Sequence, residues 1–168
     1  VAPVKNVMPW DDSCYTTSSG EFRGEYGGAQ AIYTGGPNDE TYDYMPDGAT
    51  AWIQTDLGKK MPIAYISYLP RNTGLTAEQF KGDMRGSAIL VSNDPTFATY
   101  EQLDIVPEYY ENEPPQKGIY WKFVTETPGA SYRYIRVQNK SYVFISELTV
   151  YAYQNVIEIK SADEITQI

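Results

Sequence analysis

Apolar and polar residues alternate with a period of two in several short stretches of the chain, a pattern typical of β-strands with one buried face. The clearest stretch is W-I-Q-T-D-L at residues 52–57, where Trp52, Gln54 and Asp56 alternate with the other three residues. A second run at residues 63–69, I-A-Y-I-S-Y-L, is rich in β-branched and aromatic residues and ends at Pro70. Glycine takes a positive φ at little cost. The G-K-K segment at residues 58–60 therefore predicts a polar turn between two strands, with Arg71 just beyond the second.

The rest of the chain continues this pattern of short strands between turn residues. Residues 1–28 predict an irregular entry with at most one short strand, and residues 42–50 are also predicted to be irregular. Further strands are predicted at residues 87–92, 103–106, 120–125, 132–137 and 143–153. The last of these has four expected core members, Ile145, Leu148, Val150 and Ala152. Many short strands separated by Gly, Pro, Asn and Asp predict an all-β antiparallel sandwich or barrel.

The length of 168 residues suits one domain with a substantial core. We expect that domain to cover residues 1–153. Residues 154–168 depart from the alternating pattern, and Ser161 followed by Glu164 has the spacing of a helix capping box. We interpret this segment as a linker or the start of a following module, with an integral part of the domain as the alternative.

Composition restricts the possible partners. The chain has 13 Lys and Arg against 22 Asp and Glu, a formal net charge of -9. Nucleic-acid binding rests on neutralising phosphates, so this balance argues against nucleic acid. No apolar run approaches the roughly 20 residues that span a bilayer, so we expect no membrane insertion.

The residue types present also restrict the chemistry. The chain has no histidine, which argues against sites that need an imidazole base or zinc ligand. Cys14 is the only cysteine and can form no intrachain disulfide, so we expect it to be inert. The 16 Tyr and 3 Trp residues suit sheet cores and stacking against ligand rings alike. We expect most of them to be core or sheet-surface residues.

Several motifs carry a family resemblance in consistent order between residues 29 and 153. These are W-I-Q-T-D-L-G (52–58), I-A-Y-I-S-Y-L-P-R (63–71), I-L-V-S-N-D (89–94), Y-R-Y-I-R-V (132–137) and S-E-L-T-V-Y (146–151). They resemble the discoidin, or coagulation factor five/eight type C, superfamily, and most of all the bacterial family 32 carbohydrate-binding modules. The resemblance implies a galactose-binding-domain-like jelly-roll β-sandwich of about eight antiparallel strands.

The resemblance also implies a structural calcium ion. In the family, a turn after the first sheet strand joins a late glutamate, and here these are residues 34–41 and Glu147. Calcium binds six to eight hard oxygen ligands. The expected ligands are Asp39, Thr41, Glu147 and the carbonyl of Tyr33. Thr34 stands where a ligating Asp is usual, so Asp39 would have to replace it; the alternative is a plain turn with a solvated acid.

The resemblance further implies a glycan site on the loops at one end of the sandwich. Arg71 matches an arginine whose planar fork donates to a sugar hydroxyl, and Tyr142 and Phe144 lie where the family places an aromatic ring. Asp43 and Tyr44 stand where relatives often carry a histidine and an aromatic residue. The alternatives are a surface ion pair for Arg71, hairpin packing for the two rings, and a solvated Asp43.

These inferences predict a non-catalytic module that attaches a secreted or cell-surface bacterial protein to glycans of the galactose or N-acetylhexosamine type. We expect a monomeric module within a larger multidomain protein, located outside the cell. The alternative is a protein- or cell-surface-adhesion module using the same loops. A glycosidase with paired carboxylates is disfavoured, because no acidic residue sits in a recognisable catalytic motif.

Overall fold

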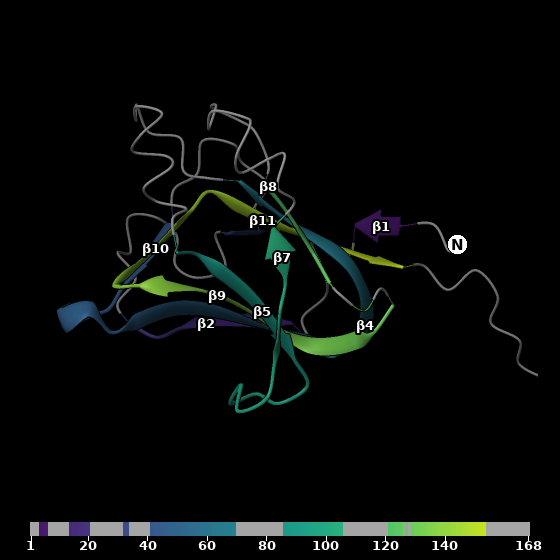
Figure 1. Ribbon diagram of the computed structural model, residues 1–168, viewed down its shortest axis with the longest axis horizontal. Coiled ribbons are helices and arrows are strands. Elements are labelled where there is room, and N and C mark those ends of the chain that lie inside the picture. Colours follow the sequence, from purple (N-terminus) through teal and green to yellow (C-terminus); the bar gives the residue numbers. More distant parts are fainter. Residues whose placement is uncertain are drawn as a thin grey trace, which may run out of the picture.

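A computed structural model describes residues 4–6, 14–20, 32–33, 41–69, 86–105, 121–125, 127 and 129–153 (Figure 1). The strands in these ranges are β1 (Val4–Asn6), β2 (Tyr15–Ser18), β3 (Thr41–Tyr44), β4 (Thr50–Leu69), β5 (Ala88–Ser92), β6 (Glu101–Gln102), β7 (Asp104–Ile105), β8 (Trp121–Val124), β9 (Ser131–Lys140), β10 (Tyr142–Ile145) and β11 (Glu147–Tyr153). Every strand pairing among them is antiparallel. The prediction of an all-β antiparallel fold is therefore confirmed.

Strand β4 belongs to both layers of the sandwich. Its first half pairs with β2 and β9, and its second half pairs with β11 and β8. Between the halves, the register with β9 jumps from Asp56 opposite Tyr134 to Met61 opposite Tyr132, and Gly58 has a φ of 76°. The predicted turn at residues 58–60 is thus a corner within one long strand, at which the chain passes from one sheet to the other.

The two sheets enclose a single main core. Strands β2, the first half of β4, β9, β5 and β6 form the first sheet, and β1, β11, the second half of β4, β8 and β7 form the second. Buried side chains from both sheets meet in one cluster that includes Ile53, Ile89 and Ile135 from the first and Ile66 and Val150 from the second. The alternation predicted for residues 52–57 is confirmed, because Ile53, Thr55 and Leu57 are buried and their neighbours are not.

The predicted strand at residues 143–153 is in fact two strands that meet at Ser146. Its expected core residues are all buried, but Val143 and Ile145 are odd-numbered and Leu148, Val150 and Ala152 are even-numbered. This change of parity requires an irregularity, and the structure places it at Ser146, whose N–H donates to the Leu69 carbonyl at 2.8 Å. Strand β10 then pairs with β3, whereas β11 pairs with β4.

Two segments predicted to be irregular contain short strands. Residues 1–28 hold two strands, β1 and β2, instead of at most one, and residues 42–50 hold most of β3 and a 3₁₀ turn at Pro46–Gly48. The sequences of β1 and β2 do not alternate, and the alternation of β3, T-Y-D-Y, covers only four residues. The three segments are strands because a neighbouring strand satisfies their backbone groups, which is information that lies elsewhere in the chain.

The sandwich has two ends (Figure 1). The β3–β10 end, on the left in the view, consists of β3, β10 and the turn at residues 45–49. The corner end, on the right, contains the corner of β4, the first residues of β9 and the last residues of β5. Strand β9 runs between them over ten residues, a length of about 33 Å at ~3.3 Å per residue.

Candidate functional site

The pairing of β3 with β10 brings together four of the residues predicted for a glycan site. Tyr142 lies opposite Tyr44, and Val143 lies opposite Asp43, so the backbones of residues 43 and 44 are direct neighbours of the strand that carries Tyr142 and Phe144. The fifth predicted residue, Arg71, lies outside the described residues. The family resemblance predicts these residues for one site although their motifs lie about a hundred residues apart, and the pairing shows which backbone positions are neighbours.

The rings of Tyr142 and Phe144 form a stacked pair at this end. Their centroids are 5.2 Å apart and their planes differ by 9°. Tyr142 is 42% exposed, while Phe144 is partly buried. Packing between the two rings, the alternative considered for them, does occur. Tyr142 nevertheless remains 42% exposed beside the Phe144 ring. A partly exposed aromatic ring is a group that a pyranose C–H face can pack against.

Backbone hydrogen bonds fix the position of this aromatic pair. Ser141 joins β9 to β10 with a φ of 64°; its N–H donates to the Ala49 carbonyl and its carbonyl accepts from the Met45 N–H, both at 2.8 Å. On the inner side, the buried Tyr68 donates its hydroxyl hydrogen to the Phe144 carbonyl. The Tyr142–Phe144 pair, called the platform below, is therefore attached both to the turn at residues 45–49 and to the core.

The end of β4 lies beside the junction of β10 and β11 at Ser146. Leu69 pairs with Glu147, and its carbonyl accepts the Ser146 N–H bond described above. Leu69 precedes Arg71 by two residues in the chain. The strand that leads to the predicted sugar-binding arginine therefore ends next to the β10–β11 junction.

The residues predicted to bind calcium are only partly described. Thr41 pairs with Ile145, two residues before Glu147, so the backbones of these two predicted ligands lie near one junction. The Glu147 carboxylate accepts a hydrogen bond from the Thr149 hydroxyl at 3.4 Å. Asp39 lies outside the described residues. Among the residues that are described, no three His, Cys, Asp or Glu side chains gather closely enough to hold a metal ion, so calcium stays a prediction.

Tyr33, the source of a predicted carbonyl ligand, uses its side chain for the core. Its hydroxyl forms a hydrogen bond with the Thr55 hydroxyl on the inner face of β4. Burial raises the pKa of Tyr33, an effect that the Thr55 hydrogen bond only partly offsets. The Tyr33 phenol is thus a structural group in the interior.

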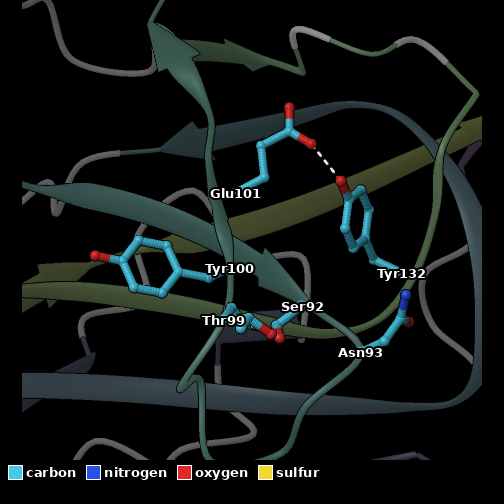
Figure 2. A pocket seen from close by; sticks show the side chains of 6 residues that line it. All are labelled: Ser92, Asn93, Thr99, Tyr100, Glu101 and Tyr132. Carbon is cyan, nitrogen blue, oxygen red and sulfur yellow. Dashed lines mark hydrogen bonds between the residues drawn. The ribbon is translucent and has the colours of Figure 1, made fainter.

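A polar hollow opens at the corner end, and sequence reasoning missed it. It has a volume of about 280 Å³ and is lined by Ser92, Asn93, Thr99, Tyr100, Glu101 and Tyr132 (Figure 2). The Tyr132 hydroxyl donates a hydrogen bond to Glu101 Oε2. Burial, together with the carboxylate of Glu101, raises the pKa of Tyr132 to about 12. The motifs I-L-V-S-N-D and Y-R-Y-I-R-V contain three residues of the hollow, Ser92, Asn93 and Tyr132, but the motifs predict only the fold.

The loop at residues 93–100, which forms one side of this hollow, is folded around Asp94. The Asp94 carboxylate accepts hydrogen bonds from the Thr96 N–H at 2.9 Å, the Thr96 hydroxyl at 2.8 Å and the Ala98 N–H at 3.2 Å. The Thr96 N–H and then its hydroxyl are the main reasons why the pKa of Asp94 lies below its usual value. An ionised Asp94 therefore stabilises the loop conformation by accepting hydrogen bonds from residues of the same loop.

The Asn93 side chain attaches this loop to β9. Its Nδ2 donates to the Ser131 carbonyl and its Oδ1 accepts from the Arg133 N–H, both at 3.0 Å. The amide thus forms the hydrogen bonds that another strand would form to the residues on either side of Tyr132. This contact holds the two walls of the hollow, residues 99–101 and Tyr132, at a fixed separation.

An aromatic and cationic stack holds the loop on the outer face of the first sheet. The Arg136 guanidinium lies 4.5 Å from the Trp52 ring centroid and 4.3 Å from that of Phe97, which is buried at the loop tip. Arg136 also donates twice to Gln54 Oε1, at 3.0 and 2.6 Å, and Gln54 donates to the Pro95 carbonyl at 3.0 Å. Trp52 is thus a sheet residue, one of the two roles expected for it.

The two-layer antiparallel sandwich has the fold of the galactose-binding-domain-like modules. The chain belongs to the F5/8 type C domain family, whose model matches residues 15–152. A comparison with curated proteins gave no match. No helix in the part of the chain that the structure describes is long and apolar enough to cross a membrane.

Solved structures share this fold at low sequence identity. A family 32 carbohydrate-binding module of NanJ from C. perfringens, in complex with galactose, is 15% identical with a TM-score of 0.59; the alignment covers 89% of this chain and 99% of that one. A fucolectin from the serum of striped bass (Morone saxatilis) is 15% identical over 84% of this chain and 47% of that one, with a TM-score of 0.61. A family 62 module of Xyl5A from Clostridium thermocellum is 18% identical over 82% and 93%, with a TM-score of 0.60.

Proposed function

We propose that this protein is a non-catalytic carbohydrate-binding module that binds glycans at its β3–β10 end. The observation that carries the proposal is the Tyr142 ring, 42% exposed, stacked on Phe144 and placed beside the strand that contains Asp43 and Tyr44. An aromatic face with a few polar groups around it is the usual composition of a sugar site.

Each predicted residue has a distinct role in this proposal. The Tyr142 face packs against the apolar C–H face of a pyranose, with Phe144 behind it as support. Asp43 accepts hydrogen bonds from neighbouring sugar hydroxyls, and Arg71 donates to a ring or hydroxyl oxygen through its planar fork. Tyr44 adds a second aromatic contact at the strand edge. We expect a terminal galactose or N-acetylhexosamine as the ligand, because the module of NanJ with the same fold binds galactose.

The exposed aromatic chemistry favours sugar over lipid or an apolar protein surface. In the described ranges, the large apolar side chains with high exposure are all tyrosines: Tyr15, Tyr100 and Tyr142. Tyrosine combines a flat face with a polar edge, whereas insertion into lipid would require Leu, Trp or Phe. This observation supports glycan binding over the alternative of an adhesion module.

We further propose a structural calcium ion near the β10–β11 junction. Glu147 and Thr41 would hold it together with Asp39 and the Tyr33 carbonyl, since calcium is bound by hard oxygens of these kinds. Bound calcium would supply positive charge that neutralises Glu147 and Asp39 and orders the turn at residues 34–41. The proposal rests on the β3–β10 pairing, which puts Thr41 opposite Ile145.

The proposed module attaches the protein that carries it to glycans. Binding at one site would be weak, with a Kd on the order of 0.1–1 mM for a small ligand with few anchors. A parent protein outside the cell that carries the module, or several modules in series, would raise the effective affinity through avidity.

A glycan array followed by calorimetry on the isolated domain tests the proposal. We expect binding of galactose-type glycans, with a loss of at least about tenfold in affinity for Tyr142→Ala and Arg71→Ala. Tyr15→Ala is the matched control, because Tyr15 is 55% exposed and pairs with Asp56 near the corner of β4, away from the site. The absence of binding to any glycan, or equal losses in Tyr142→Ala and Tyr15→Ala, would refute it.

A further inference from the structure

The hollow between Glu101 and Tyr132 lies at the opposite end of the sandwich from the proposed glycan site. Tyr132 is the second residue of β9 and is paired with Met61 at the corner of β4, whereas Tyr142 follows the other end of β9. The two positions are therefore separated by about 30 Å of extended strand. A ligand in the hollow cannot touch the Tyr142 platform.

We propose that this hollow is a second carbohydrate-binding site, which takes one sugar residue through its hydroxyl groups. The chemistry of the lining is the first reason. Its six residues are two tyrosines, a serine, a threonine, an asparagine and a glutamate, and none of the six is cationic. Sugar hydroxyls both donate and accept hydrogen bonds. The Ser92 hydroxyl and the Asn93 amide already form hydrogen bonds within the protein. Acceptance from a sugar would therefore fall to Glu101 and the Tyr132 oxygen. Donation would fall to the Thr99 hydroxyl and the second N–H of Asn93.

The charge of the lining disfavours anionic ligands. Glu101 makes the lining negative, and the whole chain carries a formal charge of -9. A phosphate, sulfate or uronate would be repelled at such a place. A neutral sugar, by contrast, gains from a carboxylate, because hydrogen bonds to an ionised acceptor are shorter and stronger than those between neutral groups.

The Glu101–Tyr132 pair is the centre of the site. Figure 2 shows the carboxylate and the phenol pointing toward each other, with Asn93 and Ser92 below them. A carboxylate offers about four acceptor positions, so Glu101 can accept from Tyr132 and from a sugar hydroxyl at the same time. The Tyr132 oxygen can in turn accept from a second hydroxyl. Two neighbouring hydroxyls of one ring would then be held by two fixed oxygens.

The size and rigidity of the hollow fit a single ring. Its volume of about 280 Å³ lies just below the ~300–1,000 Å³ typical of small-molecule sites. Asp94 templates the loop from within, Asn93 attaches it to β9, and Phe97 anchors its tip against Arg136. A site whose walls are already fixed loses little conformational entropy when a weak ligand binds.

Tyr100 extends the rim of the site. It is 57% exposed, and its ring points to the opposite side of the 99–101 segment from the Glu101–Tyr132 pair (Figure 2). It would therefore contact a neighbouring residue of a longer glycan and leave the hydrogen bonding of the first ring to Glu101 and Tyr132. Occupied sites at both ends would let one module bridge two glycan chains, with a gain from avidity.

A backbone amide NMR titration tests this inference. It depends on the proposed function for its class of ligand, so both sites are followed together in the intact chain. Galactose, N-acetylgalactosamine, glucose and N-acetylglucosamine are the probes. We expect the amides of Asn93, Glu101 and Arg133 to shift in a saturable way for at least one sugar, and to do so equally in Tyr142→Ala.

Two variants target the new site. Tyr132→Phe removes only the hydroxyl and keeps the ring in the core, and we expect a Kd about 2- to 10-fold weaker at the corner end. Glu101→Gln keeps the size and removes the charge, and we expect a similar or larger loss. In both variants the shifts at Tyr142 and Phe144 should remain, and Tyr15→Ala should change neither set.

The outcomes separate this inference from the proposed function. Shifts at Tyr142 with none around Glu101 for any sugar would overturn the second site and leave the proposed function standing. Shifts around Glu101 alone would support the second site and overturn the β3–β10 site. A stronger response around Glu101 to the methylamide of N-acetyl-lysine than to any sugar would also overturn it, because the hollow would then be a site for an ammonium group.

Discussion

Arg133 on β9 donates two parallel hydrogen bonds to the carboxylate of Asp56 on β4. The Nε and Nη2 atoms of Arg133 donate to the two carboxylate oxygens of Asp56 at 2.9 and 3.1 Å. Asp56 also accepts from the Gly58 N–H at 2.7 Å, so the pair fixes the strand immediately before the corner. The corner carries β4 from one sheet to the other, and this ion pair stabilises the turn on which the sandwich depends.

Protonation of Asp56 should therefore weaken the fold. Burial tends to raise the pKa of Asp56, but the hydrogen bonds from Arg133 and Gly58 and the Arg133 charge lower it below its usual value. A lowered folded-state pKa contributes stability that is present above about pH 4, the unfolded value, and is lost as the pH falls through the folded value. Urea unfolding of wild type and Asp56→Asn between neutral and acidic pH measures this. We expect Asp56→Asn to lose about 0.5–1 kcal/mol at pH 7, since Arg133 is 42% exposed, and to show a weaker dependence on pH. An unchanged acid profile would contradict the role of this pair.

Substitution of Arg136 by lysine should destabilise the fold. Its planar guanidinium lies between the rings of Trp52 and Phe97 while it donates twice to Gln54, and a lysine ammonium cannot do both. We expect Arg136→Lys to lose about 1 kcal/mol of unfolding free energy by chemical denaturation. Lys59→Ala, an exposed position at the corner, is the control and should change little. Equal effects of the two substitutions would mean that the stack is not stabilising.

Gly48 should matter for glycan binding as well as for stability. Its φ of 72° strains any other residue, and a Cβ there would lie 3.0 Å from Lys140 Cε, beside the β9–β10 junction that leads to Tyr142. Gly129 has a similar φ of 87° with open space around it, so Gly129→Ala is a matched control. We expect each substitution to cost about 1–2 kcal/mol of stability, but only Gly48→Ala to weaken glycan binding in calorimetry. Equal binding by both variants would show that the turn at residues 45–49 does not support the platform.

The phenol of Tyr132 should stay protonated well above pH 10. Its pKa is raised to about 12 by burial and by Glu101. A raised folded-state pKa means that the contribution to stability is fully present below the unfolded value of about 10 and is lost as the pH rises toward 12. Ultraviolet difference titration should show Tyr132 ionising at a lower pH in Glu101→Gln than in wild type, although burial, the larger cause, still raises its pKa in the variant. Tyr132→Phe should flatten the alkaline loss of stability; an unchanged alkaline profile would rule out the Glu101 hydrogen bond in solution.

Calcium should stabilise the fold, as proposed for the β10–β11 junction. A ligand that binds only the folded state stabilises it by about 2.7 kcal/mol at a hundredfold excess over its Kd. Thermal unfolding with calcium or with EDTA measures the effect, and magnesium at equal concentration tests selectivity. Glu147→Gln should reduce the calcium-dependent shift, whereas Glu101→Gln should leave it intact. A melting temperature that is the same with calcium and with EDTA would exclude the site.

The local pattern of the sequence determined most of the strands and the core. The alternation at residues 52–57 placed Ile53 and Leu57 inside, and even the break at Ser146 is visible as a change of parity between Ile145 and Leu148. These features are predictable because a strand buries every second side chain, so the evidence lies within a few neighbouring residues. The family motifs predicted the jelly-roll sandwich.

Tertiary structure decided which strands pair at the β3–β10 end and which segments form the hollow at the corner end. The alternation of T-Y-D-Y in β3 covers only four residues, too few to predict a strand by itself. The segment is a strand beside Tyr142 because β10 satisfies its backbone. The polar hollow is assembled from residues 92–93, residues 99–101 and Tyr132, which no local pattern connects. A binding site depends on contacts between distant segments, and those contacts are fixed only when the sheets pair and the corner of β4 brings them into register.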